Sequence, residues 1–170
     1  GNISLAAGTT LDLSLAGNQS IGSLSGTGGT VNLGANTLTL NGLGNTAFGG
    51  VIAGTGGLIK LGTGIQTLDG ASSFTGGVDL NAGGLLLGNN AALGTGVLNV
   101  SGNVTLDGTA ALTLANNINL GAGDSLDLLG AQALTFNGVD EWPGWCSQSM
   151  AVSEITHFNC STQRAGGLGG

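Results

Sequence analysis

The sequence predicts an all-β fold in which short strands wind into a solenoid, and three observations support this prediction. Glycine accounts for 36 of the 170 residues. Charged residues make up only 6% and aromatic residues 4%, whereas about 25% of the residues in an average soluble domain are charged. Aliphatic and small polar residues alternate in short runs that end at glycine or asparagine, which places the aliphatic side chains on one face of a strand.

The alternating runs follow one another along most of the chain. Helical spacing is not sustained in residues 1–139, where each glycine would cost a helix about 1 kcal/mol. We therefore expect strands joined by tight turns throughout this part. The clearest runs are residues 10–15, 30–33, 37–40, 77–80, 97–100, 104–107, 112–114 and 125–128.

Two architectures fit short strands joined by glycine-rich turns, namely an antiparallel sandwich and a parallel solenoid. The turns are too short for the crossover helices of a doubly wound fold. A sandwich usually has longer strands, hairpin turns and aromatic core residues, so we favour the solenoid. About fifteen strands at three per coil predict about five coils. Each inward aliphatic side chain would pack on its counterpart in the next coil, while glycine and asparagine supply positive φ values at the corners.

Composition divides the chain near residue 139. Residues 1–139 contain no cysteine, proline, tryptophan or histidine. We therefore predict a β-solenoid repeat region over residues 1–139 and an atypical tail over residues 140–170. The tail could cap the open end of the solenoid, form a disordered segment or be a non-native extension. It holds Trp142, Pro143, Trp145, Cys146, Met150, His157 and Cys160.

The tail offers the few residues that could form a cross-link or bind a metal. Cys146, His157 and Cys160, with Glu154 nearby, could suggest a zinc site, but no C-x-x-C spacing is present. We favour a disulfide between Cys146 and Cys160 in an oxidising compartment, and two free thiols are the alternative. Apolar residues spaced i, i+4 and i+7 predict one short helix over residues 147–158, so we expect an irregular or partly helical segment here.

The charge balance excludes several classes of partner. The net charge is −7, and Lys60 and Arg164 are the only lysine and arginine. No basic patch can form, so binding to nucleic acid or to anionic lipid is disfavoured. No uninterrupted apolar run of about 18 residues exists, so we expect no transmembrane helix and no segment embedded in a membrane.

The aspartates are the first candidates for catalysis, because some parallel β-helices cleave polysaccharides with clustered carboxylates. They are spread over different strands, without a catalytic arginine, lysine or histidine nearby in the sequence. We therefore expect no catalytic residue, and we interpret the protein as a structural module, not an enzyme. The aspartates considered are Asp12, Asp69, Asp79, Asp107, Asp124 and Asp127.

Other binding motifs are incomplete. A calcium roll needs tandem glycine- and aspartate-rich nonapeptides, but residues 121–127 approach this pattern only once. The glycine-rich segments 26–29 and 54–57 lack the Gly-Lys-Ser/Thr of a phosphate-binding loop. Residues 37–39 give the single Thr-x-Thr, so the threonine ladder of an ice-binding solenoid is missing. We therefore expect no metal and no cofactor.

The most specific signal lies in residues 57–88. Residues 57–70 read G-L-I-K-L-G-T-G-I-Q-T-L-D-G, and residues 71–88 continue A-S-S-F-T-G-G-V-D-L-N-A-G-G-L-L-L-G. This stretch resembles the autotransporter-associated β-strand repeat, also called the passenger-associated transport repeat. The pattern of that repeat is roughly G-x-L-x-K-x-G-x-G-x-x-x-L-x-G, then an aromatic-Thr-Gly-Gly step, then N-A-G-x-L-x-L-G. Residues 89–96 resemble its usual continuation.

The resemblance implies a right-handed parallel β-helix in the passenger of a type V secreted protein at the bacterial surface. We expect a scaffold or stalk that supports adhesion and outward secretion. Its partner would be a host or neighbouring cell surface, or a second copy of itself. The first alternative is a self-assembling extracellular filament or surface-layer subunit, because open coil ends can pair. A carbohydrate-binding or carbohydrate-cleaving β-helix is the second alternative.

Overall fold

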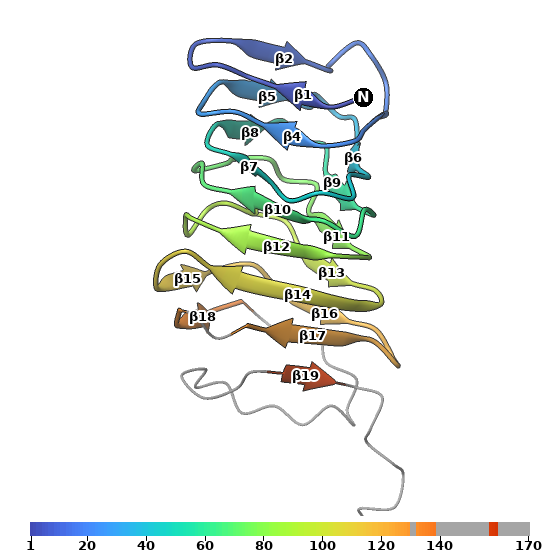
Figure 1. Ribbon diagram of the computed structural model, residues 1–170, viewed down its shortest axis with the longest axis vertical. Helices are drawn as coiled ribbons and strands as arrows, with labels where there is room; N and C mark the ends of the chain where they lie inside the picture. The colour runs from blue at the N-terminus through green and yellow to red at the C-terminus, as the bar shows by residue number, and fades with distance from the viewer. Residues whose placement is uncertain (130–131, 139–156, 160–170) are drawn as a thin grey trace, which may run out of the picture.

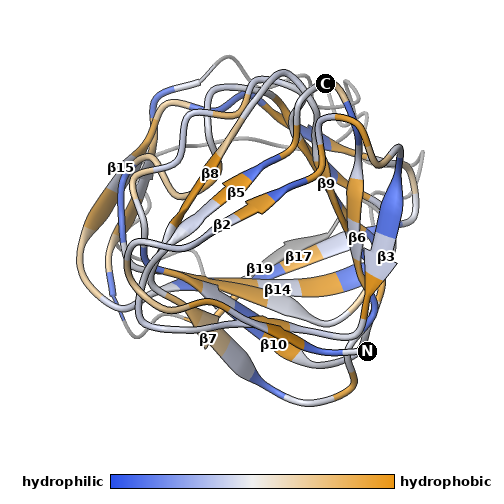
Figure 2. Ribbon diagram, turned by 90° about the horizontal axis from the view of Figure 1, so that it is seen from above, coloured by the Kyte–Doolittle hydropathy of each residue, from blue (hydrophilic) through white to orange (hydrophobic). Residues whose placement is uncertain are grey.

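The computed structural model describes residues 1–129, 132–138 and 157–159, and every element within them is a β-strand. The strands stack as a solenoid of about seven turns (Figure 1). As the chain descends from the N-terminus, it runs from right to left on the near face and returns behind, so the winding is right-handed (Figures 1 and 2). The predicted right-handed parallel β-helix is thus confirmed.

Three faces enclose the interior, as the view along the axis shows (Figure 2). The front face, nearest the viewer in Figure 1, consists of a two-stranded and a six-stranded sheet joined by a bridge between Gly26 and Phe48. Its strands are β1 (Ile3–Ser4), β4 (Leu24–Ser25), β7 (Thr46–Phe48), β10 (Ile65–Leu68), β12 (Gly84–Leu87), β14 (Asn103–Gly108), β17 (Ser125–Leu128) and β19 (His157–Asn159).

The rear face contains two separate sheets. Between them, residues 71–75 and 91–95 cross this face without forming a strand. They keep the stacking nonetheless, because Ser73 N–H donates to Ile52 O at 2.9 Å and Thr95 N–H to Phe74 O at 3.0 Å. The strands of the rear face are β2 (Thr10–Asp12), β5 (Thr30–Asn32), β8 (Val51–Ala53), β15 (Leu112–Leu114) and β18 (Leu134–Phe136).

The side face is the most regular of the three. Its six strands are all parallel and form one sheet. From β6 to β16 the register advances by 20 residues per turn. The strands are β3 (Gln19–Ile21), β6 (Leu38–Leu40), β9 (Leu58–Lys60), β11 (Val78–Leu80), β13 (Leu98–Val100) and β16 (Ile118–Leu120).

We number the turns from the N-terminus. Turns 1, 2, 3 and 6 have a strand on each face, starting at β1, β4, β7 and β14. Turns 4 and 5 have strands on the front and side faces only, namely β10 with β11 and β12 with β13. Turn 7 has β17 and β18. Consecutive turns hydrogen-bond to each other, so no turn stands alone.

The prediction of about five coils is wrong, because the solenoid has about seven turns. Strands such as β1 and β4 have only two residues, too few to be recognised by alternation. The two crossings of the rear face that form no strand also break the expected count of three strands per coil. The sandwich alternative is excluded, because the strand pairs from β1 to β18 are parallel.

Glycine allows consecutive turns to approach at the corners. Gly26 has φ of +128°, and a Cβ there would collide with the carbonyl oxygen of Leu5 in the turn above. Gly54 has φ of +120° and lies against the backbone of Gly34. A side chain at either position would meet both a strained backbone and a steric clash.

The edge of β17 that faces away from β14 is occupied by β19, which pairs with it in the antiparallel direction. The helix predicted over residues 147–158 is therefore wrong at 157–158, and residues 147–156 lie outside the described residues. An exposed strand edge offers unpaired N–H and C=O groups, and an extended segment satisfies them where a helix would not. Cys146, Cys160 and the boundary after residue 139 also lie outside the described residues, so the disulfide and the division into two parts stay predictions.

Candidate functional site: a layered interior and its outer ladders

The interior consists of columns of side chains that run along the axis. On the side face, one inward column holds four aliphatic residues and one lysine, and all five are at most 3% exposed. Burial of each aliphatic side chain contributes roughly 1.5–3 kcal/mol. The rigidity of the rod depends on these columns, because no turn can bury its apolar side chains without its neighbours. This column is Leu40, Lys60, Leu80, Val100 and Leu120.

Three of the four phenylalanines, Phe48, Phe74 and Phe136, also lie inside. Phe48 and Phe74 are fully buried, and Phe136 is 7% exposed. Carbohydrate-binding grooves usually present aromatic side chains to the sugar, and these three rings are used for packing instead. Nothing in their placement favours the carbohydrate-binding alternative.

Lys60 points inward, although it is one of only two cationic side chains in the sequence. It takes the position that Leu40 and Leu80 take in the adjacent turns. Its Nζ donates a hydrogen bond to the carbonyl oxygen of Gly62 at the corner that follows β9. Burial lowers the pKa of Lys60 below its ordinary value of 10.5, because the charged form loses hydration.

Gln66 is another buried polar residue, with 2% of its surface exposed. Its Nε2 donates to Leu24 O at 2.8 Å and to Thr67 O at 3.0 Å, and its Oε1 accepts from the hydroxyl of Thr46 at 3.0 Å. Leu24 N–H also lies 3.5 Å from Oε1. The carboxamide on turn 4 therefore contacts backbone or side chain on turns 3 and 2.

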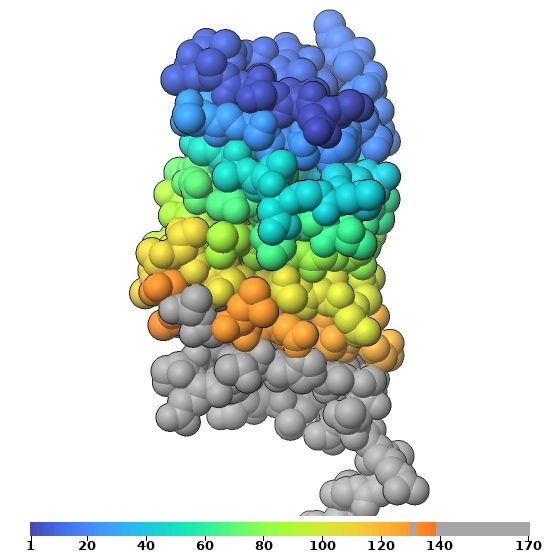
Figure 3. Space-filling view, viewed as in Figure 1, coloured from blue at the N-terminus to red at the C-terminus, as the bar shows by residue number. Residues whose placement is uncertain are grey.

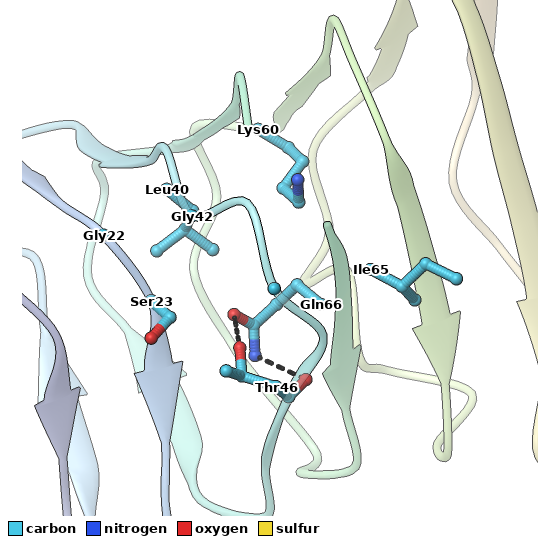
Figure 4. A pocket seen from close by; sticks show the side chains of 9 residues that line it. Gly22, Ser23, Leu40, Gly42, Thr46, Lys60, Ile65 and Gln66 are labelled. Atoms are coloured by element: carbon cyan, nitrogen blue, oxygen red, sulfur yellow. Dashed lines mark hydrogen bonds between the residues drawn. The ribbon is translucent and has the colours of Figure 1, made fainter. Parts of the chain in front are cut away.

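Lys60, Gln66 and Thr46 line one small hollow between the front and side faces (Figure 4). It has room for about one water molecule. No carboxylate lines it, so the charge of Lys60 has only neutral dipoles around it here. The other lining residues are Gly22, Ser23, Leu40, Gly42, Gly44 and Ile65.

The aspartates considered as catalytic candidates do not come together. No two of them are partners in any strand pairing of the described residues. Instead, several hold the backbone locally. Asp124 accepts from Gly102 N–H at 2.7 Å, and Asp107, which is 5% exposed, accepts from Gly108 N–H at 2.8 Å. Asp69 is exposed, and Asp127 lies on β17 opposite Thr105.

Outward polar residues form short ladders between turns. On the side face, Asn99 Nδ2 donates to Asp79 Oδ1 at 2.8 Å and Asn119 Nδ2 to Asn99 Oδ1 at 3.3 Å. On the rear face, Asn32 Nδ2 donates to Asp12 Oδ1 at 3.0 Å. The pKa of Asp12 is lowered, mainly because its carboxylate accepts hydrogen bonds from Ser14.

A shallow outer groove of about 530 Å³ lies at the corner before β9 and β11. Gly57 and Gly77 occupy the positions that precede these strands, where Thr37 precedes β6. A Cβ at Gly57 or Gly77 would meet the backbone of the next turn, at Gly77 O and at Val97 O respectively. Asp79 is the one charged residue among the lining set. The full set is Ala35, Thr37, Thr55, Gly56, Gly57, Leu58, Ile59, Gly76, Gly77 and Asp79.

No group of histidine, cysteine, aspartate or glutamate that could hold a metal occurs among the residues that the structure describes. Within residues 121–127, Asp124 is turned towards the amide of Gly102. The glycine-rich segments 26–29 and 54–57 form corners, as their positive φ values show. The tail residues His157 and Cys160, considered for zinc, lie where no side chain is described.

The inward placement of Lys60 and Gln66 was missed, although the sequence contains the signal for it. Leu58 and Lys60 are two residues apart, and so are Gln66 and Leu68, so strict alternation puts each pair on the same face. Long polar side chains usually lie at the surface, so alternation alone does not establish their inward placement. The partners of Gln66 could not be found in this way, because they come from strands one and two turns away.

The outer surface follows the order of the turns. In the space-filling view the coloured bands lie one below another from the N-terminus onward (Figure 3). Each patch of surface along the axis therefore comes from consecutive turns. Within the described chain, no helix has the length and apolarity needed to cross a membrane.

Comparison with known proteins adds one finding. Residues 58–87 match the family described as passenger-associated-transport-repeat. This match confirms the resemblance identified in residues 57–88, and it covers β9 to β12, including Lys60 and Gln66. No curated protein and no solved structure matches the chain.

Proposed function

We propose that this chain is a structural scaffold in the passenger of a bacterial autotransporter, displayed at the cell surface or secreted. The observation that carries the proposal is the passenger-associated-transport-repeat match at residues 58–87, located within a continuous parallel stack. A rod of this kind would hold other parts of a passenger away from the membrane. Stepwise addition of turns would also favour outward movement of the chain, since each turn is stabilised by the one already folded.

The module works without catalysis in this proposal. The aspartates are separated and are used in local hydrogen bonds, and the interior is filled with aliphatic side chains. Adhesion to a host or neighbouring cell is the role we assign to the passenger that the rod supports.

The strand β12 offers a test with an internal control. Leu85 and Leu87 point inward with 3% and 0% exposure, whereas Leu86 between them points outward and is partly exposed. Leu85→Asp and Leu87→Asp would each bury an unpaired carboxylate, and Leu86→Asp would leave the charge in water. The full-length protein is expressed in its natural host, and surface exposure is measured by protease treatment and antibody labelling of intact cells.

We expect the two inward variants to lose most surface labelling and protease resistance, and the outward variant to retain both. Equal surface labelling of all three variants would contradict the role of stacking in export. If the unmodified protein is found only inside the cell, the assignment to a surface passenger is wrong.

A further inference from the structure

The turns of this solenoid are nearly interchangeable on the side face. From β6 to β16 each strand begins at an inward aliphatic residue, and the register step is constant. A strand that skipped one turn would still find aliphatic partners. If β11 paired with β6, for example, Val78 would stack on Leu38 and Leu80 on Leu40. Apolar packing on this face therefore does little to specify which turn follows which.

The front face contains one feature that distinguishes the turns. The sheet is interrupted between β4 and β7, where the backbones meet at the Gly26 to Phe48 bridge, with Gly26 N–H donating to Ala47 O at 3.0 Å and Gly49 N–H to Gly26 O at 2.8 Å. The peptide groups of Leu24, which is fully buried, pair with the carboxamide of Gln66 instead of with β7. The hydrogen bonds of Gln66 therefore reach a strand two turns away.

The carboxamide also requires the turn between. Thr46, on the intervening strand β7, donates its hydroxyl hydrogen to Gln66 Oε1 at 3.0 Å. Thr46 and Gln66 are direct partners in the register of β7 and β10. The amide thus makes its full set of hydrogen bonds only when turn 2, turn 3 and turn 4 are stacked in this order.

We propose that Gln66 is a register-determining residue that prevents turn 3 from being skipped as the solenoid folds. If β10 paired directly with β4, the backbone of β10 would occupy the peptide groups of Leu24, and Thr46 would be absent. The amide of Gln66 would then lose its partners on Leu24 and Thr46 and keep only Thr67 O of its own strand, which disfavours the skipped arrangement by about tenfold or more. The inference concerns how turns choose their partners, and it holds whether or not the chain is a surface passenger.

Replacing Gln66 by a residue of similar length without an amide removes the penalty on the skipped arrangement and also the hydrogen bonds that favour the correct one. In Gln66→Met the skipped arrangement no longer buries an incompletely paired amide, and the correct arrangement leaves the peptide groups of Leu24 without the carboxamide as a partner. Leu85→Met is the matched control, because Leu85 follows Gln66 in the same inward column and the substitution changes no hydrogen bond. Both variants are made in the chain with Cys146→Ser and Cys160→Ser.

Disulfide trapping during refolding reports the register directly. The outward residues Thr39, Ile59 and Asp79 lie on β6, β9 and β11 and are successive register partners. Adjacent strands are about 4.8 Å apart, so cysteines at positions 39 and 59 can form a disulfide. Positions 39 and 79 are about 10 Å apart when turn 3 is in place, which is beyond the roughly 7 Å limit for a disulfide. Thr39→Cys with Asp79→Cys therefore reports the skipped arrangement, and Thr39→Cys with Ile59→Cys reports the correct one.

The chain is refolded from denaturant under oxidising conditions, and the disulfide-linked fraction is measured by peptide mapping. We expect Gln66→Met to raise the 39–79 linkage at least tenfold over the unmodified residue and over Leu85→Met. Equal 39–79 linkage in Gln66→Met and Leu85→Met would overturn the proposal. If Gln66→Met forms neither linkage because it does not fold, Thr46→Val decides, since it removes one hydrogen bond and keeps the shape. A 39–79 linkage in Thr46→Val no greater than in Leu85→Met would also overturn it.

Discussion

The front-face column has two parts with different chemistry. In turns 3 and 4 it contains Thr46 and Gln66, which form hydrogen bonds beside a hollow, while in turns 5 to 7 it continues as Leu85, Leu106 and Leu128. The aliphatic part gains stability from packing. The polar part gives up some of that gain, because a buried amide must find partners to offset its lost hydration. Within one column, therefore, the aliphatic part supplies stability, and the polar part, in our proposal, determines which turns stack on each other.

The largest expected effect lies in the aliphatic part. Leu106 is fully buried between Leu85 and Leu128. Leu106→Ala would leave a cavity in the column and is expected to lower the free energy of unfolding by about 2–5 kcal/mol. Thr105→Ala is the control, because Thr105 is the neighbouring residue on the opposite face of β14. Urea denaturation followed by circular dichroism measures the free energy of unfolding of both variants. Equal losses would show that inward packing is not the main source of stability in this column.

A buried corner amide should give an intermediate effect. Asn116 is 3% exposed, and its Nδ2 donates to Gly94 O at 3.1 Å and to Gly96 O at 2.8 Å in the turn above. Asn116→Ala would leave both carbonyl groups without this donor and is expected to cost about 1–3 kcal/mol. Asn119→Ala, at an exposed site on β16, should cost clearly less in the same denaturation experiment.

Sequence reasoning predicted the fold class because its determinants are local. Alternation within three or four residues identifies an inward aliphatic face, and glycine marks the corners. The number of turns depended on strands such as β1 and β4, whose two residues are defined by pairing with distant residues instead of by their own pattern. The partners of Gln66 were out of reach for the same reason, since Leu24 lies in a turn whose position only the folded stack determines.

Lys60, which lies on the side face beside the same hollow, predicts a pH dependence of stability. Because the pKa of Lys60 is lowered by burial, the folded state binds fewer protons than the unfolded state between the folded pKa and 10.5. Its contribution to stability is therefore unfavourable at neutral pH and becomes less so as the pH rises through that window. Lys60→Met should raise the free energy of unfolding at pH 7. It should also remove the increase in that free energy which Lys60 contributes as the pH rises.

The quantity to measure is the difference in the free energy of unfolding between Lys60→Met and the unmodified chain, because all other titrating groups are common to both. Urea midpoints between pH 7 and pH 11 give it directly. A difference that stays constant across that range would mean that the ammonium of Lys60 is hydrated in the folded state.

The smallest effect is expected on the outer ladder of the side face. Asn99 accepts from Asn119 and donates to Asp79, and it is partly exposed, so water can replace either partner. Asn99→Ala should therefore lower the free energy of unfolding by at most about 1 kcal/mol, even though it breaks two inter-turn hydrogen bonds, as does Asn116→Ala. A loss as large as that of Asn116→Ala would mean that hydrogen bonds stabilise this rod equally inside and outside, and that burial does not set their value.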